Sequence, residues 1–222
     1  MNLCLIVPLA GDKPEYTTRM PRVFNFAPDG TLLCIKSVEG LEISKFNHIY
    51  FTILQKHDEQ YSVSELLRMQ FSRKGWQNAE VVVLETPTKS QPETVYETIS
   101  KMHINEAIMI KDGDGYFTCD FTLQNGIVIY PLDQLEMVNP HNKSYVAVDD
   151  QYYITNIIEK KIISRYFNAG GYLFESTFEY CKCYEDLKDH GKLYLSHIVY
   201  AMLLGGHSFR PFFCSEYEDW GE

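Results

Sequence analysis

The chain has 222 residues, of which 45% are hydrophobic and 23% are charged, and its formal net charge at pH 7 is −10. This composition excludes a disordered or fibrous chain, and the length is sufficient for a full hydrophobic core. The negative charge argues against sequence-independent binding of nucleic acid, which needs clustered Lys and Arg. No apolar run reaches the roughly 18 residues of a membrane span.

The first half of the chain alternates short apolar runs with amphipathic segments. Buried strands are predicted at 3–10, 48–54, 79–85 and 107–112. Helices are predicted at 62–75, with Ser62 or Ser64 as the N-cap and Gly75 at the end, and at 91–103, with Pro92 in the first turn. This alternation indicates a parallel sheet with helices on both of its faces.

The second half of the chain has a different pattern. Residues 145–163 alternate around a turn at Asp149-Asp150 and predict antiparallel strands, and 169–174 predicts a core strand entered through a glycine pair. Helices are predicted at 176–191 and 193–207, and the chain closes with a strand and an acidic end at 208–222. We find no repeat or linker, so we predict one α/β domain.

Two carboxylates stand directly after the apolar run that ends at residue 111. Asp112 and Asp114 alternate there with Gly113 and Gly115. In open α/β sheets ligands bind outside the carboxyl ends of the strands, and Mg²⁺ is commonly held by one or two carboxylates together with substrate phosphate oxygens. The alternative is a solvated turn, in which Asp and Gly are also common.

Six segments, in this order along the chain, resemble the nucleotidyltransferase family that activates sugar phosphates, phosphocholine and related phosphates: IVPLAG (6–11), SQPETV (90–95), IKDGDGYF (110–117), IIEKK (157–161), NAGGYLF (168–174) and EYEDWG (216–221). The resemblance spans nearly the whole chain. It implies a single Rossmann-like, GT-A-type α/β domain over 1–222, with a mostly parallel central sheet, helices on both faces and a small antiparallel sheet on the substrate side.

The resemblance also implies a role for each matching residue. Those expected to bind the nucleotide are Leu9, Ala10, Gly11, Gln91, which would read the base, and Asp112. Those expected to bind Mg²⁺ are Asp114 and Asp219, and those expected to meet the acceptor are Glu159, Gly170 and Gly171. Arg22 and Lys160 are the expected catalytic cations.

Each of these residues also has a purely structural interpretation. Gln91 could be an ordinary first residue of a helix, and Glu159-Lys160-Lys161 could be a solvated run of charge. The pair Gly170-Gly171 could mark a bulge or tight turn. Asp219 lies in the acidic run EYEDWGE, as a residue of a surface tail would.

The chain departs from the family pattern in the segment 11–22. The family has a glycine-rich loop whose backbone N–H groups cradle a triphosphate, followed by Pro-Lys. Here Gly11 remains, Asp12 and Glu15 bring negative charge, and Pro14 removes a donor. Pro21-Arg22 replaces Pro-Lys, and the additional cations that could compensate are Lys13 and Arg19.

The function implied is a Mg²⁺-dependent nucleotidyltransferase that couples a nucleoside triphosphate to a small phosphorylated acceptor, with release of pyrophosphate, for surface polysaccharide or lipid precursors. The alternatives are a GT-A-type glycosyltransferase with Asp112-Gly113-Asp114 as its D-x-D motif, a catalytically degenerate nucleotide-sugar-binding domain, and a structural partner domain. The six cysteines form no CxxC pair, so we expect reduced thiols in a cytoplasmic protein. It could form a homo-oligomer, and a further domain could follow residue 222.

Overall fold

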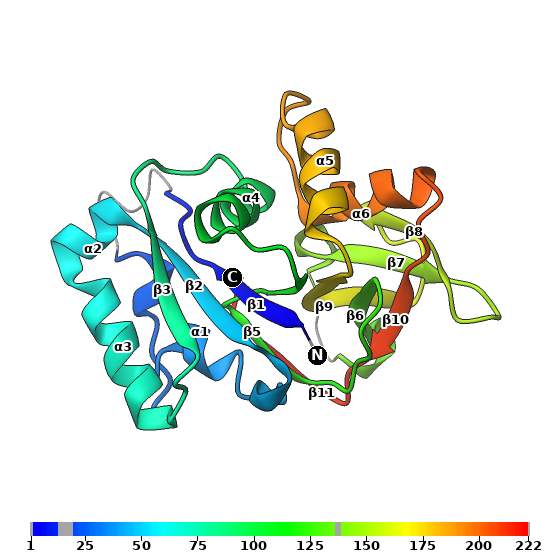
Figure 1. The fold of residues 1–222 in the computed structure, drawn as a ribbon. Helices are drawn as coiled ribbons and strands as arrows, with labels where there is room; N and C mark the ends of the chain where they lie inside the picture. The colour runs from blue at the N-terminus through cyan, green and yellow to red at the C-terminus, as the bar shows by residue number, and fades with distance from the viewer. Residues whose placement is uncertain (1, 13–19, 136–138, 222) are drawn as a thin grey trace.

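A nine-stranded sheet runs through the centre of the computed structural model, which describes residues 2–12, 20–135 and 139–221 (Figure 1). The strands of its continuous path are, in spatial order, β10 (Arg210–Phe213), β6 (Gly126–Pro131), β9 (Tyr166–Phe174), β4 (Ala107–Lys111), β1 (Leu3–Pro8), β2 (His48–Leu54) and β3 (Ala79–Leu84). Strand β1 is parallel to β2 and β4, β2 is parallel to β3, and β10 is parallel to β6. Strand β9 is antiparallel to both of its neighbours, β4 and β6.

An antiparallel ribbon branches from this sheet. It consists of β7 (Ser144–Val148) and β8 (Ile154–Glu159), and β7 also pairs with β9. The turn between the two strands is held by Asp149, whose Oδ1 accepts hydrogen bonds from the backbone N–H groups of Gln151 and Tyr153. The predicted antiparallel unit is therefore present, and it is joined to the main sheet.

Helices cover both faces of the sheet (Figure 1). On one face lie α4 (Gln91–Met102), α5 (Thr177–Leu187) and α6 (Leu195–Leu204), and on the other lie α1 (Leu33–Lys36) and α3 (Val63–Lys74), with α2 (Gln55–Tyr61) leading into α3. A hydrophobic core lies on each face of the sheet, and strand β4 contributes to both. Ile108 and Ile110 pack on the α4 side, and Met109 packs on the α3 side. This α/β architecture confirms the predicted fold class.

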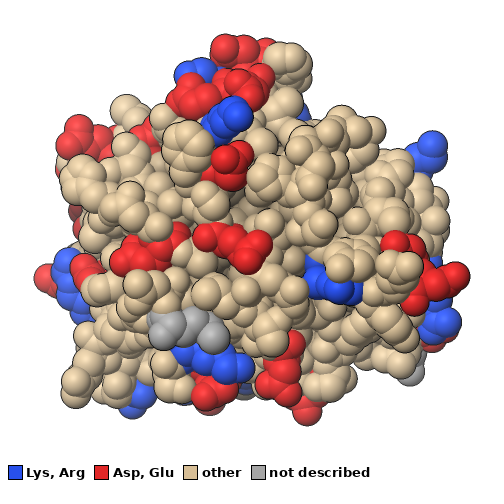
Figure 2. All heavy atoms as spheres, turned by 45° about the vertical axis from the view of Figure 1, so that its right-hand side comes forward, with Lys and Arg blue, Asp and Glu red and all other residues tan. Residues whose placement is uncertain are grey.

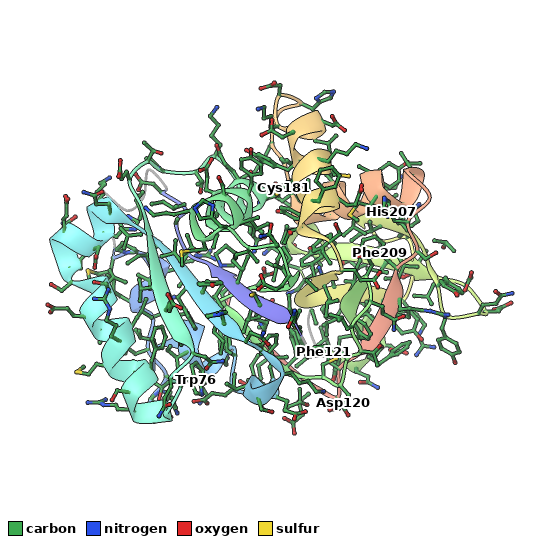
Figure 3. All side chains as sticks on the ribbon, viewed as in Figure 1. Trp76, Asp120, Phe121, Cys181, His207 and Phe209 are labelled. Carbon is green, nitrogen blue, oxygen red and sulfur yellow. The ribbon has the colours of Figure 1, made fainter. Side chains whose placement is uncertain are left out.

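The α5–α6 layer is fixed by aromatic packing. Phe209 lies where the chain passes from α6 to β10 (Figure 3), and its ring packs on Phe174 of β9 with a centroid separation of 5.9 Å. Tyr180 of α5 contacts the same Phe174 ring at 5.0 Å. These edge-to-face contacts hold the second half of the chain against the parallel strands.

One local prediction is confirmed in position only, and one was wrong. Ser62 is the N-cap residue of α3, as predicted, but its side chain makes no cap hydrogen bond. Asp58 Oδ1, in the unpredicted helix α2, accepts instead from the Ser64 N–H at 2.7 Å. The glycine pair does not precede the strand but lies inside β9, where the pairing with β6 shifts register. Asn168 Oδ1 accepts from the N–H groups of Gly170 and Gly171 at this bulge.

A separate two-stranded sheet brings the end of the chain to the centre. It is formed by β5 (Gly115–Thr118) and β11 (Glu216–Asp219), which pair antiparallel with Asp219 opposite Gly115. The Trp220 N–H extends this contact by donating to the Asp114 carbonyl oxygen at 2.8 Å. Residues more than a hundred positions apart therefore meet at the carboxyl end of β4.

The surface shows no single dominant charge on the face drawn in Figure 2, where Lys and Arg side chains are scattered among small groups of Asp and Glu. All six cysteines are free thiols. In the described part of the chain, no helix combines the length and the apolarity that crossing a membrane would require.

Candidate functional site

A polar cleft of about 290 Å³ opens at the carboxyl end of β4. Its walls come from the turn after β4, the first residue of α4, the β7–β8 ribbon and the end of β11. Eight of the predicted site residues line it: Arg22, Gln91, Asp112, Asp114, Glu159, Lys160, Gly170 and Asp219. The fold thus brings together side chains that are scattered over the whole sequence.

Asp114 and Asp219 lie on either side of one glycine. A Cβ built on Gly221 would lie 3.0 Å from Asp114 Oδ2 and 3.2 Å from Asp219 Oδ1, so both carboxylates face the same small space. Each also has a cationic partner, because Arg22 Nη1 lies 2.9 Å from Asp114 Oδ2 and Lys143 contacts Asp219.

These two carboxylates fit a Mg²⁺ site. Within the described ranges no group of three or more His, Cys, Asp and Glu side chains has the geometry of a metal site. Magnesium does not need one, because it usually takes one or two carboxylates and completes its octahedron with water and substrate phosphate oxygens. The facing oxygens of Asp114 and Asp219 supply that minimal set, so their metal-binding role stays a prediction that the geometry permits.

Asp112 is half-buried between α4 and β9. Its Oδ1 accepts a hydrogen bond from Gln91, and its carboxyl packs on the bare backbone of Gly170, where an added Cβ would lie 2.9 Å from Oδ2. Gly170 has φ +91°, a conformation that favours glycine. Burial, with the negative charge of Asp114 as the next cause, raises the pKa of Asp112 to about 6.

We expect Asp112 to make folding stability depend on pH in mild acid. Its pKa rises from an ordinary 3.8 to about 6, so between these values the folded state binds a proton that the unfolded state has released. The unfolding free energy of the wild type should therefore fall, relative to Asp112→Asn, as the pH rises from about 4 to 6. Urea unfolding of both proteins at several pH values measures this, and a pH-independent difference would contradict it.

Lys111 supports the turn from beneath. It is fully buried at the end of β4, and its Nζ donates to the carbonyl oxygens of Asp112 and Gly115 at 2.7 Å each. The ammonium also lies 4.5 Å from the ring centroid of Phe117. Burial lowers the pKa of Lys111 to about 8, against the opposing charges of Asp112 and Asp114. Lys111 therefore ties together the two ends of the turn that presents Asp114.

Glu159, the last residue of β8, lines the cleft. Its Oε2 accepts hydrogen bonds from the hydroxyls of Ser144 at 2.6 Å and Ser196 at 2.7 Å. Two short bonds to one oxygen fix the carboxylate, and its other oxygen has no hydrogen bond among these contacts. Glu159 is thus suited to accept a hydrogen bond from a hydroxyl group of a bound molecule.

Lys160 follows Glu159 in a left-handed conformation with φ +61°. Its Nζ lies 3.2 Å from the Tyr194 hydroxyl and 5.1 Å from the centroid of that ring, and Lys192 lies 5.3 Å from the same centroid. Although burial raises the pKa of Tyr194, its hydrogen bonds with Lys192 and Lys160 lower it below the ordinary value. Lys160 and Lys192 therefore both bring positive charge to the Tyr194 side of the cleft.

The remaining predicted residues are not among those that line the cleft. Leu9 donates its N–H to the Thr52 carbonyl, Ala10 is fully buried, and Gly11 forms a bridge with Thr88. The bare face of Gly171 is filled by Val128 and Phe117.

The segment 11–22 is described only at its two ends. Asp12 pairs with Lys56 at 3.1 Å and lies 3.6 Å from His57 Nε2, so α2 neutralises this anion. Pro14, Glu15, Lys13 and Arg19 lie outside the described residues.

Several cleft residues were not predicted from the sequence: Lys143, Ser144, Asn168, Tyr194 and Tyr217. Asn168 stands inside a quoted motif and could have been found there. Ser144 begins β7 and Lys143 precedes it. That strand was predicted only from its apolar alternation, and nothing in the local sequence marks either residue as functional.

Comparison with protein-family models and with curated protein sequences gives no match. Among solved structures, the chain is similar to a nucleoside-diphosphate-sugar pyrophosphorylase from Vibrio cholerae RC9, with a TM-score of 0.79 and 17% identity over 97% of this chain and 95% of that one. It is similar to an inositol-1-phosphate CTP transferase from T. maritima, with a TM-score of 0.71 and 15% identity over 99% and 89% of the two chains.

A third similar structure is a Bacillus anthracis protein assigned as a glucose-1-phosphate thymidylyltransferase, in complex with a sucrose; its TM-score is 0.69, with 13% identity over 98% of this chain and 89% of that one. At these identities the likeness concerns the fold and not the substrates. The chain therefore has the fold of sugar-phosphate nucleotidyltransferases, as its sequence motifs predict.

Proposed function

We propose that this protein is a Mg²⁺-dependent nucleotidyltransferase that joins a nucleoside triphosphate to a sugar phosphate or a similar small phosphorylated acceptor and releases pyrophosphate. The observation that carries the proposal is the meeting of Asp114 and Asp219 against Gly221, inside a cleft that also contains Arg22, Lys143 and Lys160. The shared fold with three nucleotidyltransferases supports the same conclusion. An activated sugar or head group of this kind is suited to the assembly of surface polysaccharide or lipid.

The cleft residues match the demands of this reaction. An acceptor phosphate oxygen attacks the α-phosphorus while pyrophosphate leaves, so catalysis consists of positioning the two reactants and neutralising their charge. We assign Lys160, which lines the cleft, to the acceptor phosphate. We assign Glu159, whose carboxylate is fixed by its two serines, to a hydroxyl group of the acceptor. Arg22 is the last residue of the segment 11–22, where the triphosphate is expected, and its side chain lines the cleft.

Asp114 and Asp219 are the residues that would hold Mg²⁺. The ion would neutralise phosphate charge and orient the reacting groups when it is bound. The Asp114 carbonyl and the Gly115 carbonyl are fixed by the Trp220 N–H and by Lys111, so the protein holds the Asp114 side of the site in place before a ligand arrives.

The part of the cleft lined by Glu159, Lys160 and Tyr194, called the acceptor wall below, favours a hydroxylated molecule over a quaternary ammonium. Recognition of choline uses open aromatic faces, whereas Lys160 and Lys192 both lie over the ring of Tyr194. A choline group there would meet like charge, which costs affinity. Among the acceptors of this family, we therefore propose a sugar phosphate or polyol phosphate rather than phosphocholine.

The alternative reaction, glycosyl transfer with Asp112-Gly113-Asp114 as a D-x-D motif, has weaker support. The carboxyl group of Asp112 is engaged by Gln91 and packs on Gly170, and it is not a second free ligand beside Asp114.

A screen for pyrophosphate release tests the proposed function. Each of the four common nucleoside triphosphates is combined with sugar phosphates, an inositol phosphate and phosphocholine, with Mg²⁺ or with EDTA. We expect release for one nucleotide and a hydroxylated acceptor, its loss in EDTA, and a rate with phosphocholine at least about tenfold lower. Mg²⁺-independent release, or none with any pair, would contradict the proposal, and a preference for phosphocholine would contradict the assignment of the acceptor wall.

A further inference from the structure

Lys143 is a cleft cation that the sequence motifs do not explain. It lies immediately before β7, and its Nζ contacts both the Asp219 carboxylate and the Tyr217 hydroxyl. The ammonium lies 5.5 Å from the ring centroid of Phe167 and 5.2 Å from that of Tyr217, and its side chain is only 13% exposed. The two rings add cation–π attraction to the contact of the ammonium with Asp219.

The position of Lys143 joins the two halves of the cleft. Its carbonyl oxygen accepts the Lys160 N–H at 2.8 Å, and the next residue, Ser144, holds Glu159. On its other side Lys143 touches Asp219, one of the two carboxylates expected to hold Mg²⁺. Lys143 therefore lies between the acceptor wall and the metal carboxylates, where the reacting phosphates would meet.

The charges around Asp219 and Asp114 are balanced as the structure stands. Asp114 is paired with Arg22 and Asp219 with Lys143, so each carboxylate already has one cation. A divalent ion between the facing oxygens would compete with Arg22 for Asp114 Oδ2. On Asp219 it would face Oδ1 while Lys143 contacts Oδ2, so the ion and the ammonium would compete for the negative charge of one carboxylate. The charge of Lys143 then becomes available to another anion, and the phosphates of the substrates are the anions that enter this cleft.

We propose, on the basis of the function proposed above, that Lys143 is a phosphate-binding residue that Asp219 holds in place until Mg²⁺ takes that carboxylate. Lys143 then meets the transferring phosphate from the side of β7. It adds positive charge to that of Arg22, which lines the cleft from the described part of the segment 11–22. Asp219 thus has two successive partners, a lysine before the metal and the metal afterwards.

Calorimetry on Lys143→Met separates this role from a structural one. Removal of the competing cation should tighten the binding of Mg²⁺ alone, by about tenfold, and should weaken the binding of pyrophosphate in saturating Mg²⁺ by about tenfold or more. If Lys143 merely held β11 in place, both affinities would fall together. Lys143→Arg keeps the charge and should retain both affinities, and Lys188→Met, which removes an exposed lysine paired with Glu185, is the matched control.

Labelling of the wild type gives a second test that needs no variant. The amine of Lys143 should react faster with an acylating reagent when Mg²⁺ is added, because its contact with Asp219 is broken, and slower again when pyrophosphate follows. Lys188 should label equally throughout. Mg²⁺ binding to Lys143→Met that is no tighter than wild type, or labelling of Lys143 that ignores Mg²⁺, would overturn the inference. Failure of wild-type protein to bind pyrophosphate would instead count against the proposed function.

Discussion

Asp219→Asn is expected to lower kcat/KM for pyrophosphate release by about a hundredfold or more, because removal of one element of charge stabilisation commonly costs that much. Asparagine preserves the shape of the side chain and its bond from the Gly221 N–H, but it removes the negative charge that faces Asp114. The steady-state rates of wild type and variant, with the nucleotide and acceptor found in the screen, measure the effect.

The same substitution should leave the folded state almost unchanged. The Lys143–Asp219 pair is partly exposed, and pairs of this kind contribute about 1 kcal/mol or less to the free energy of unfolding. Glu218→Gln is the matched control, because Glu218 is the preceding residue of β11 and lies outside the cleft lining. An Asp219→Asn protein with wild-type kcat/KM, or one that is inactive because it is unfolded, would contradict the assignment.

Gly40→Ala is expected to lower the free energy of unfolding by about 3 kcal/mol, because it forces overpacking against backbone. A Cβ on Gly40 would lie 1.9 Å from the Phe117 carbonyl oxygen and 2.8 Å from its carbonyl carbon, and neither atom can move without displacing β5. For a chain of this size the midpoint of thermal unfolding should fall by roughly 10 °C. Thermal and urea unfolding measure the change.

Gly40→Ala should also disturb the candidate Mg²⁺ site. Strand β5 pairs with β11, so a shift of Phe117 moves the strand that carries Asp219, and Mg²⁺ binding should weaken as stability falls. Gly11→Ala is the control for stability, since no atom lies within 4 Å of its added Cβ. If Gly40→Ala were as stable as wild type, the close approach of residue 40 to β5 would not be real.

The parallel half of the sheet could be predicted from the sequence because each of its strands carries its own signal. The apolar runs of β1, β2 and β4 are nearly continuous, as expected for strands covered on both faces, and the edge strand β3 is marked by its apolar run at 81–84. Strands β5 and β11 have four residues each and alternate only weakly, and their pairing joins positions about a hundred residues apart. The local sequence pattern does not show which distant segments pair with each other.

The candidate site could be predicted from the sequence where a family motif directly follows a clearly predicted element. Asp114 follows a clear strand, but Asp219 was named only through the family resemblance, and its interpretation as a surface tail was equally consistent with the local sequence. No feature of the local sequence marks Lys143 as a site residue, because its contacts with Tyr217 and Asp219 exist only in the folded chain. Gly170 was named for an acceptor, whereas its missing side chain also makes room for Asp112.

The most direct test of a Mg²⁺-dependent nucleotide site is calorimetric titration of each nucleoside triphosphate, with and without Mg²⁺, into wild type and into an Asp114→Asn, Asp219→Asn double variant. We predict that the wild type binds one triphosphate in a Mg²⁺-dependent manner and that the double variant, still folded, does not. Triphosphate binding that needs neither Mg²⁺ nor the two carboxylates, or no binding of any triphosphate, would contradict this account.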